Sequence, residues 1–152
     1  MLFRSADQIQ VTGNSNYSKI DVINYDDVKN VVKDVDIVID LIAYSLTSSI
    51  NETIHNAQVN IIGLLNVLEA CRQNGIKKII FTSASSLIGE PEKYQVSETH
   101  PAKPKTAYGI TKLASEHYLR LYSELYGLPF VDRKSTRLNS SHVSESRMPS
   151  SA

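Results

Sequence analysis

Short apolar segments alternate with segments of helical spacing along most of the chain, and this alternation constrains the fold more than any other feature. Apolar runs typical of strands occupy residues 20–23, 36–42, 77–82 and 128–131. Helical patterns lie between them, at 26–33, in a longer stretch that ends near Gly75, and at 106–126. Strands that are apolar almost throughout are typical of parallel sheets, whose strand–helix–strand units close with right-handed crossovers. The sequence therefore predicts an α/β fold built on a parallel sheet.

Two of these helices carry a periodic apolar stripe, which predicts a packed face. In the first helix the stripe consists of Ile54, Ala57, Ile61, Leu64 and Leu68. In the second it consists of Leu113, His117, Leu121 and Leu125, and Gly127 is expected to end the helix. Because His117 belongs to this stripe, we interpret it as a packed helix residue and not as a catalytic base.

The composition argues against several classes of partner and location. Sixteen basic residues balance sixteen acidic ones, so no overall field attracts nucleic acid or an anionic membrane surface. The single cysteine, Cys71, has no partner for an intrachain disulfide, and no Cys/His spacing resembles a metal site. No apolar run has transmembrane length and the first residues lack a signal-peptide pattern. We therefore expect a cytoplasmic protein that binds neither nucleic acid nor membrane.

The composition changes abruptly after Val131. Residues 132–152 are rich in serine, have almost no large apolar side chains and show neither helical nor strand periodicity. This segment resembles translated sequencing-adapter read-through more than evolved protein. We therefore predict two parts, a folded domain at 1–131 and a disordered, non-native tail at 132–152.

One pair of residues has a spacing with a clear chemical use. Tyr108 and Lys112 are four residues apart, which places a phenol and an ammonium on one face of a helix. A phenol normally ionises near pH ~10, and an adjacent cation favours the phenolate. Tyr108 is thus a candidate for exchanging a proton with a substrate hydroxyl. The spacing alone is weak, because Tyr25 and Lys29 share it, and we interpret that second pair as part of a surface helix.

The surroundings of Tyr108 separate the two pairs. Its helix follows a strand that ends in a hydroxyl cluster at 82–86, which includes Ser83 and Ser85. Ligands of open parallel sheets bind at the carboxyl ends of the strands. A hydroxyl at that edge is placed to bond the same substrate oxygen as Tyr108.

At this point the chain resembles a known family, the extended short-chain dehydrogenases/reductases of the NAD-dependent epimerase/dehydratase group. Residues 36–43 are similar to the family's strand ending in His-Leu-Ala-Ala. Residues 60–70 follow its Asn-x-x-Gly-Thr-x-Asn-x-Leu-x-Ala helix, and 79–83, Gly89 and 104–112 continue the register. The similarity covers 18–131, and the motifs together are far more specific than any one of them.

The resemblance implies a Rossmann-like, doubly wound sheet and a role for each matching residue. Tyr108 is the implied proton acceptor and donor, while Lys112 lowers its pKa and holds the ribose of NAD or NADP. Further cofactor contacts are implied for Asp21 near the adenine, for Asn60, and along the cofactor for Leu41, Ile42 and Ala43. For Leu41, Ile42 and Ala43 a role in the core is an equal alternative, and Asp21 has the alternative of opening a turn.

Three departures from the family pattern limit what is implied. Gly13 is the only glycine before Gly63, so the glycine-rich turn for the pyrophosphate is missing, and we expect the chain to begin after the first βα unit. Ala84 stands five residues before Gly89, where members usually carry the active-site Ser or Thr. The substrate domain that follows in the family is also missing.

The resemblance also bears on the reaction and the partners. Family dehydratases carry an acidic residue just after the active-site hydroxyl, where this chain has Ser85 and Ser86. An epimerase or reductase of a sugar nucleotide is therefore favoured, and pairing as a homodimer is implied. Two alternatives stay open: a non-catalytic NAD(P)-binding relative, and an inert fragment.

Overall fold

The computed structural model describes residues 18–91, 96–97 and 100–135. Its centre is a sheet of β1 (Ile37–Asp40), β2 (Lys78–Ala84) and β3 (Phe130–Ser135) in that spatial order. Both strand pairs are parallel, with Ile37 beside Lys78 and Ile79 beside Phe130. The predicted parallel α/β sheet is therefore confirmed.

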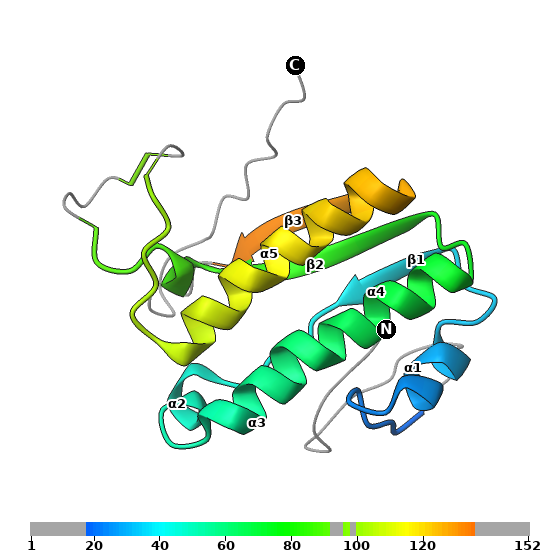
Figure 1. Ribbon diagram of the computed structural model, residues 1–152, viewed down its shortest axis with the longest axis horizontal. Helices are drawn as coiled ribbons and strands as arrows, with labels where there is room; N and C mark the ends of the chain where they lie inside the picture. Colours follow the sequence, from blue (N-terminus) through cyan, green and yellow to red (C-terminus); the bar gives the residue numbers. More distant parts are fainter. Residues whose placement is uncertain (1–17, 92–95, 98–99, 136–152) are drawn as a thin grey trace, which may run out of the picture.

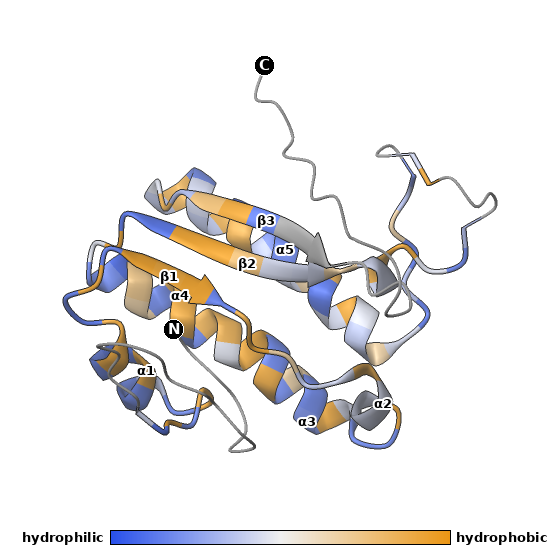
Figure 2. Ribbon diagram, turned by 180° about the vertical axis from the view of Figure 1, so that it is seen from behind, coloured by the Kyte–Doolittle hydropathy of each residue, from blue (hydrophilic) through white to orange (hydrophobic). Residues whose placement is uncertain are grey.

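The helices, in chain order, are α1 (Tyr25–Val31), α2 (Leu46–Ser49), α3 (Thr53–Ala57), the π-helical segment η1 (Gln58–Ile62), α4 (Gly63–Gln73), the 3-10 turn η2 (Ser85–Leu87) and α5 (Ala107–Tyr126). The long helices α4 and α5 lie side by side across one face of the sheet (Figure 1). On the opposite face the strands are in full view (Figure 2), and Ile37 and Ile39 there are 52% and 38% exposed. Within the described residues, the two long helices thus cover a single face.

The core lies between the sheet and these two helices. Val38 of β1 and Ile79 and Phe81 of β2 point into it and meet buried side chains of α4 and α5, among them Leu68 and Leu119. Cys71 is also fully buried there, and burial raises the pKa of its thiol to about 12. Cys71 thus packs as a small apolar side chain.

The expected strand at 20–23 is wrong, because a side chain competes for the backbone there. Asp21 Oδ1 accepts from the Ile23 N–H at 3.0 Å and the Asp21 carbonyl accepts from Asn24 N–H at 3.0 Å, which closes a turn. Asn24 Oδ1 then caps α1 by accepting from the N–H groups of Asp26 and Asp27. Short polar side chains at both ends of the run therefore convert it into a helix entry.

The strand β3 runs four residues past the composition change after Val131. β3 continues through Ser135, and its residues 132–135 pair with 81–84 of β2. Backbone pairing requires no particular side chain, so composition does not reveal it. Residues 136–152 of the predicted tail lie outside the described residues.

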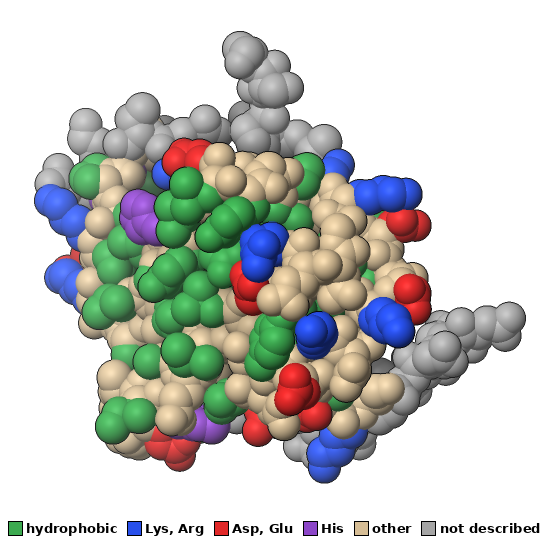
Figure 3. All heavy atoms as spheres, turned by 45° about the vertical axis from the view of Figure 1, so that its right-hand side comes forward, with side chains coloured by type: hydrophobic (Ala, Val, Ile, Leu, Met, Phe, Trp, Pro, Cys, Tyr) green, Lys and Arg blue, Asp and Glu red, His purple; other side chains and the backbone are tan. Residues whose placement is uncertain are grey.

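The apolar stripes of the sequence mark the buried helix faces only in part. Leu64 and Leu68 of the first stripe are buried, whereas His117 of the second is exposed, so its interpretation as a packed residue is wrong. Ile54 is 78% exposed, and Leu121 and Leu125 are 43% and 62% exposed. The buried side of α5 instead carries Thr111, Lys112, Ser115, Glu116 and Leu119. A space-filling view shows apolar side chains gathered on the outer surface of the molecule (Figure 3).

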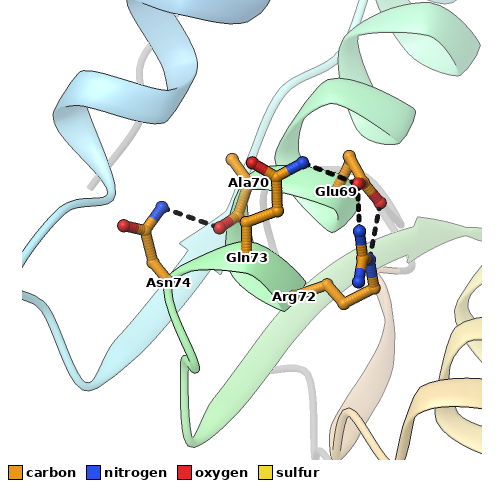
Figure 4. A network of polar contacts seen from close by, with 5 residues as sticks. All are labelled: Glu69, Ala70, Arg72, Gln73 and Asn74. Atoms are coloured by element: carbon orange, nitrogen blue, oxygen red, sulfur yellow. Dashed lines mark hydrogen bonds and ion pairs between the residues drawn. The ribbon is translucent and has the colours of Figure 1, made fainter.

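The ends of the two long helices are closed by local polar contacts. Thr106 caps the start of α5 by accepting from the Gly109 N–H at 3.0 Å. Gly127 ends the helix in the left-handed conformation, with φ 65°. The predicted limits of 106–126 are therefore confirmed. At the end of α4, Glu69 accepts from Arg72 and Gln73 while Asn74 donates to the Ala70 carbonyl (Figure 4). Across the described ranges, no helix is both long and apolar enough to span a membrane.

Candidate active site

Lys112 joins the carboxyl ends of β1 and β2. Its Nζ donates to the Thr82 carbonyl at 2.9 Å and to the Ile42 carbonyl at 3.3 Å, and the residue is only 2% exposed. The Phe81 ring lies beneath it, with its centroid 4.5 Å from Nζ. The helix α5 therefore delivers an ammonium to the edge of the sheet where the sequence predicts the site.

Tyr108 stands one turn before Lys112 and is half-buried. The Lys112 Nζ lies 5.9 Å from the centroid of its ring, because the ammonium is directed at the strand carbonyls. Burial raises the pKa of the Tyr108 phenol above its ordinary value of 10.0. In the chain by itself Tyr108 therefore keeps its proton at neutral pH, and the lowering of its pKa by Lys112 remains a prediction.

Burial lowers the pKa of Lys112, while the charges of Asp40 and Asp132 act in the opposite direction. Asp40 ends β1 and Asp132 lies in β3, so both neighbouring strands supply a carboxylate near the ammonium. Among the described residues, no group of three His, Cys, Asp or Glu side chains is arranged to hold a metal ion.

The two predicted serines occupy different positions. Ser83 is buried and donates to Glu116 Oε1 at 2.6 Å, which ties β2 to the middle of α5. Ser85 is partly buried at the start of η2, directly after Ala84. The Ser86 hydroxyl is buried and has no hydrogen-bond partner among the described residues. The structure thus commits Ser83 to Glu116 and leaves an unsatisfied hydroxyl at Ser86.

Asn60 is the centre of a buried polar network. Its Oδ1 accepts from the Tyr44 N–H at 2.6 Å, and its Nδ2 donates to Thr111 Oγ1 at 3.1 Å. Thr111 Oγ1 also lies 3.3 Å from Asn56 Oδ1, and Ser115 Oγ lies 3.4 Å from the Asn60 carbonyl. The network fixes the first turns of α5, which carry Tyr108, to η1 and to the loop after β1.

The local backbone makes this network possible. Asn60 lies in η1, where the Gly63 N–H bonds to the Gln58 carbonyl five residues back, as in a π-helix. Gly109 allows α5 to approach η2 closely, since a Cβ on it would lie 2.5 Å from the Ser86 carbonyl oxygen. The wide turn of η1 therefore positions Asn60. The missing side chain at Gly109 positions the neighbouring Tyr108 close to η2.

The structure brings some of the predicted cofactor residues together and leaves others apart. Leu41, Ile42 and Ala43 directly follow β1, and the Ile42 carbonyl contacts Lys112. Asp21 lies in the turn before α1. Asn66 of α4 stabilises this turn by donating to the carbonyls of Val22 and Ile23. The turn agrees with the alternative stated for Asp21, and its contact with adenine remains a prediction.

Several residues of this site were not predicted, namely Asp40, Asn56, Thr111, Ser115 and Glu116. Thr111, Ser115 and Glu116 could have been found from their spacing in the sequence. With Lys112 they form a polar stripe at spacings of three and four, on one face of α5. The signal for Asp40 is a carboxylate in an otherwise apolar strand. Both signals are visible in the sequence once the outer stripe of α5 is recognised as exposed.

Comparison with known proteins agrees with this geometry. Residues 3–149 match the family described as GDP-mannose 4,6 dehydratase. A putative UDP-glucose 4-epimerase of Methanocaldococcus jannaschii is 35% identical over 130 residues, which cover 79% of this chain and 43% of that protein. The chain thus spans less than half the length of this relative.

Two solved structures share the fold at similar identity. The UDP-glucose 4-epimerase of Thermus thermophilus in complex with NAD is 35% identical with a TM-score of 0.69, covering 74% of this chain and 38% of that one. The UDP-N-acetylglucosamine 4-epimerase of Methanobrevibacter ruminantium, in complex with UDP-N-acetylmuramic acid, is 36% identical with a TM-score of 0.66, covering 70% and 34%.

Proposed function

Since the chain belongs to the GDP-mannose 4,6 dehydratase family, we propose that it carries the proton-transfer half of an NAD- or NADP-dependent epimerase or reductase acting on a sugar nucleotide. One observation supports this most: a buried lysine on α5 reaches the carboxyl ends of two parallel strands, one helical turn from a half-buried tyrosine. That edge is where parallel sheets of this kind bind ligands.

The residues at this edge fit the nicotinamide half of such a cofactor. The Lys112 ammonium has three N–H donors. Two of them donate to the carbonyls of Ile42 and Thr82. The remaining donor suits a ribose hydroxyl. No glycine-rich turn for a pyrophosphate occurs in the described residues, and we assign the residues at this edge to the nicotinamide side of the cofactor. When bound, the cofactor supplies hydride transfer.

Tyr108 moves the proton in this proposal. In the reductive direction its phenol donates a proton to the oxygen of the forming alcohol, and in the oxidative direction its phenolate accepts one. Because burial raises its pKa, Tyr108 is protonated at neutral pH, which is the form that the reductive step requires. Lys112 contributes a fixed positive charge that stabilises the phenolate when a bound ligand draws the two groups together. The Asn60 network keeps Tyr108 at the sheet edge.

Simple redox chemistry at one carbinol is favoured over dehydration. Elimination of water needs an additional acid or base. Ser85 and Ser86 occupy the positions at which family dehydratases carry that group, and neither provides a carboxylate. An epimerase or reductase is therefore the better proposal, even though the family takes its name from a dehydratase.

A second candidate function rests on Ala84 and Ser83. Ala84 has no hydroxyl to offer a substrate, and the Ser83 hydroxyl is engaged by Glu116. Both features suit a relative that binds NAD or NADP without catalysis.

We also propose that the chain pairs with a second copy through its outer helices. Exposed apolar side chains from the α3–η1 stretch and α5 support this proposal, among them Ile54, Ile62, Ile110 and Leu121. Analytical ultracentrifugation tests it, and pairing should be lost when Leu121 is changed to Glu.

A chimera that carries residues 18–135 within a full-length epimerase tests the catalytic proposal. Tyr108→Phe keeps the ring but removes the ionisable oxygen, so turnover of the sugar nucleotide should fall by about a hundredfold or more. Tyr25→Phe, the other tyrosine four residues before a lysine, should leave turnover unchanged. Normal turnover of the Tyr108→Phe chimera would instead favour the non-catalytic binding protein.

A further inference from the structure

Asp40 is a buried carboxylate that the proposed chemistry does not use. It is the last residue of β1, is 1% exposed and faces the helices α4 and α5. Its Oδ1 accepts from the Ile42 N–H at 2.8 Å, so the side chain folds the backbone of the turn that follows the strand. The turn in question is the one whose carbonyl contacts Lys112.

Asp40 and Lys112 are connected by a closed ring of hydrogen bonds through Ile42 and Thr82. The Asp40 carboxylate holds the Ile42 N–H, and the Ile42 carbonyl accepts from Lys112 Nζ at 3.3 Å. Lys112 Nζ also donates to the Thr82 carbonyl, and Thr82 Oγ1 donates back to the Asp40 carbonyl at 3.2 Å. Both carbonyls that receive the ammonium are thus fixed by contacts with Asp40.

Each element packed around Asp40 contributes a titratable group near it or near Lys112. Lys112 approaches from α5, Cys71 from α4 and Asp132 from β3. Burial raises the pKa of the Cys71 thiol to about 12, so it is neutral at physiological pH. Burial also raises the pKa of Asp40, while its contact with the Ile42 N–H and the charge of Lys112 oppose that rise. Lys112 is therefore the cation that favours the ionised form of Asp40.

We propose that Asp40 is a positioning residue for Lys112: its carboxylate orders the turn whose Ile42 carbonyl receives the ammonium, and it supplies the negative charge that keeps the buried ammonium protonated. The proposal rests on the assigned role of Lys112 in the proposed function. An anchored, charged Lys112 directs its third N–H donor out of the sheet edge, towards the position of a ligand. Without Asp40, the buried ammonium loses a favourable charge in a medium of low dielectric.

The experiment follows the titration of Lys112 by NMR in the full chain with 13C-labelled lysine, the resonance being assigned by its loss in Lys112→Met. Asp40→Asn keeps an acceptor for the Ile42 N–H but removes the charge, so the titration midpoint of Lys112 should move to lower pH. Asp40→Leu should move it at least as far and also shift the Ile42 amide resonance. A matched control is Asp36→Asn, which removes a carboxylate 2.8 Å from Lys77 on the surface and should leave Lys112 unchanged.

An unchanged Lys112 midpoint in Asp40→Asn would overturn the proposal. If Asp40→Asn fails to fold, the double variant Asp40→Asn/Lys112→Met decides: restored folding supports the pairing of the two charges, and continued failure contradicts it. The titration needs neither substrate nor turnover. A catalytic failure in the Tyr108→Phe test and a failed Asp40–Lys112 coupling are therefore separate results.

Discussion

The ammonium nitrogen of Lys112 lies 5.9 Å from the centroid of the Tyr108 ring, with no hydrogen bond between the two side chains. Lys29 lies at the same distance of 5.9 Å from the Tyr25 ring. The four-residue spacing therefore fixes the separation in both pairs and does not by itself distinguish a site. Burial does distinguish them, because Lys112 is 2% exposed and contacts two strand ends, whereas Lys29 lies on the exposed side of α1.

Replacing Lys112 by methionine should change how stability depends on pH. Burial lowers the pKa of Lys112 from its ordinary value of 10.5. Between the lowered pKa and 10.5 the unfolded chain binds more protons than the folded chain, so this residue makes the free energy of unfolding rise with pH. The stability of Lys112→Met relative to wild type should therefore be highest near neutral pH and decrease towards pH 10.5.

Urea unfolding at a series of pH values measures this difference. Lys29→Met supplies the baseline for the loss of one exposed lysine. A Lys112→Met difference that stays constant over the whole window would show that the folded and unfolded states bind protons at Lys112 equally.

Two helical glycines should respond differently to alanine. A Cβ at Gly109 would lie 2.5 Å from the backbone oxygen of Ser86, whereas a Cβ at Gly63 would lie 2.9 Å from a methyl carbon of Val22. A side chain can adjust its rotamer, but a backbone carbonyl moves only with its turn. Gly109→Ala should therefore lower the free energy of unfolding by about 2 kcal/mol or more, and Gly63→Ala by less than about 1 kcal/mol.

Chemical denaturation of both variants provides the measurement. Equal losses at the two positions would mean that η2 yields as easily as the Val22 side chain. In that case the close approach of α5 to η2 would not determine where Tyr108 lies.

Shortening the chain at two different points should separate β3 from the segment beyond it. Removing 132–152 deletes the part of β3 that pairs with residues 81–84, so the melting temperature should drop by several degrees. Removing only 136–152 should leave it unchanged, because the composition of that segment predicts no packed core. Differential scanning calorimetry compares the two, and equal melting temperatures would contradict the assignment of 132–135 to the sheet.

The contact between Glu69 and Arg72 should stabilise the chain only above acidic pH. The hydrogen bond from Arg72, and to a lesser degree the one from Gln73, lowers the pKa of Glu69 from 4.5 to about 2. The stabilisation is present above pH 4.5 and is lost as the pH falls towards about 2. Because the pair lies at the surface, the free energy of unfolding of wild type should exceed that of Glu69→Gln by no more than about 1 kcal/mol, and by less at high salt. An advantage that persists near pH 2 would exclude ionised Glu69 as its source.

Local signals allowed part of the fold to be predicted. The limits of α5 followed from Thr106 and Gly127, whose effects act within one helical turn. The parallel sheet followed from the apolar runs that became β1 and β2. At 20–23 the apolar pattern failed because Asp21 and Asn24 bind the backbone themselves.

Tertiary contacts decide what the sequence did not reveal. The Lys112 position was predictable, but its two carbonyl partners lie 30 and 70 residues away in the chain. Ser83 was expected at the substrate, and its bond to Glu116 depends on the side chain that α5 presents 33 residues later. The apolar stripe of α5 lies on its exposed side, and an apolar pattern alone does not show which side of a helix meets the sheet.

The π-helical segment η1 makes the spacing along this helix sensitive to chain length. Its wide turn holds one residue more than an α-helical turn would. Deleting a single residue from Gln58–Ile62 would restore regular α-helical winding and displace the residues inside the turn, Asn60 among them, while α3 and α4 would keep their relative faces. Asn60 Oδ1 would then leave the Tyr44 N–H, from which it accepts at 2.6 Å, although both residues were still present. The number of residues in this helix is thus as much a determinant of the site as their identity.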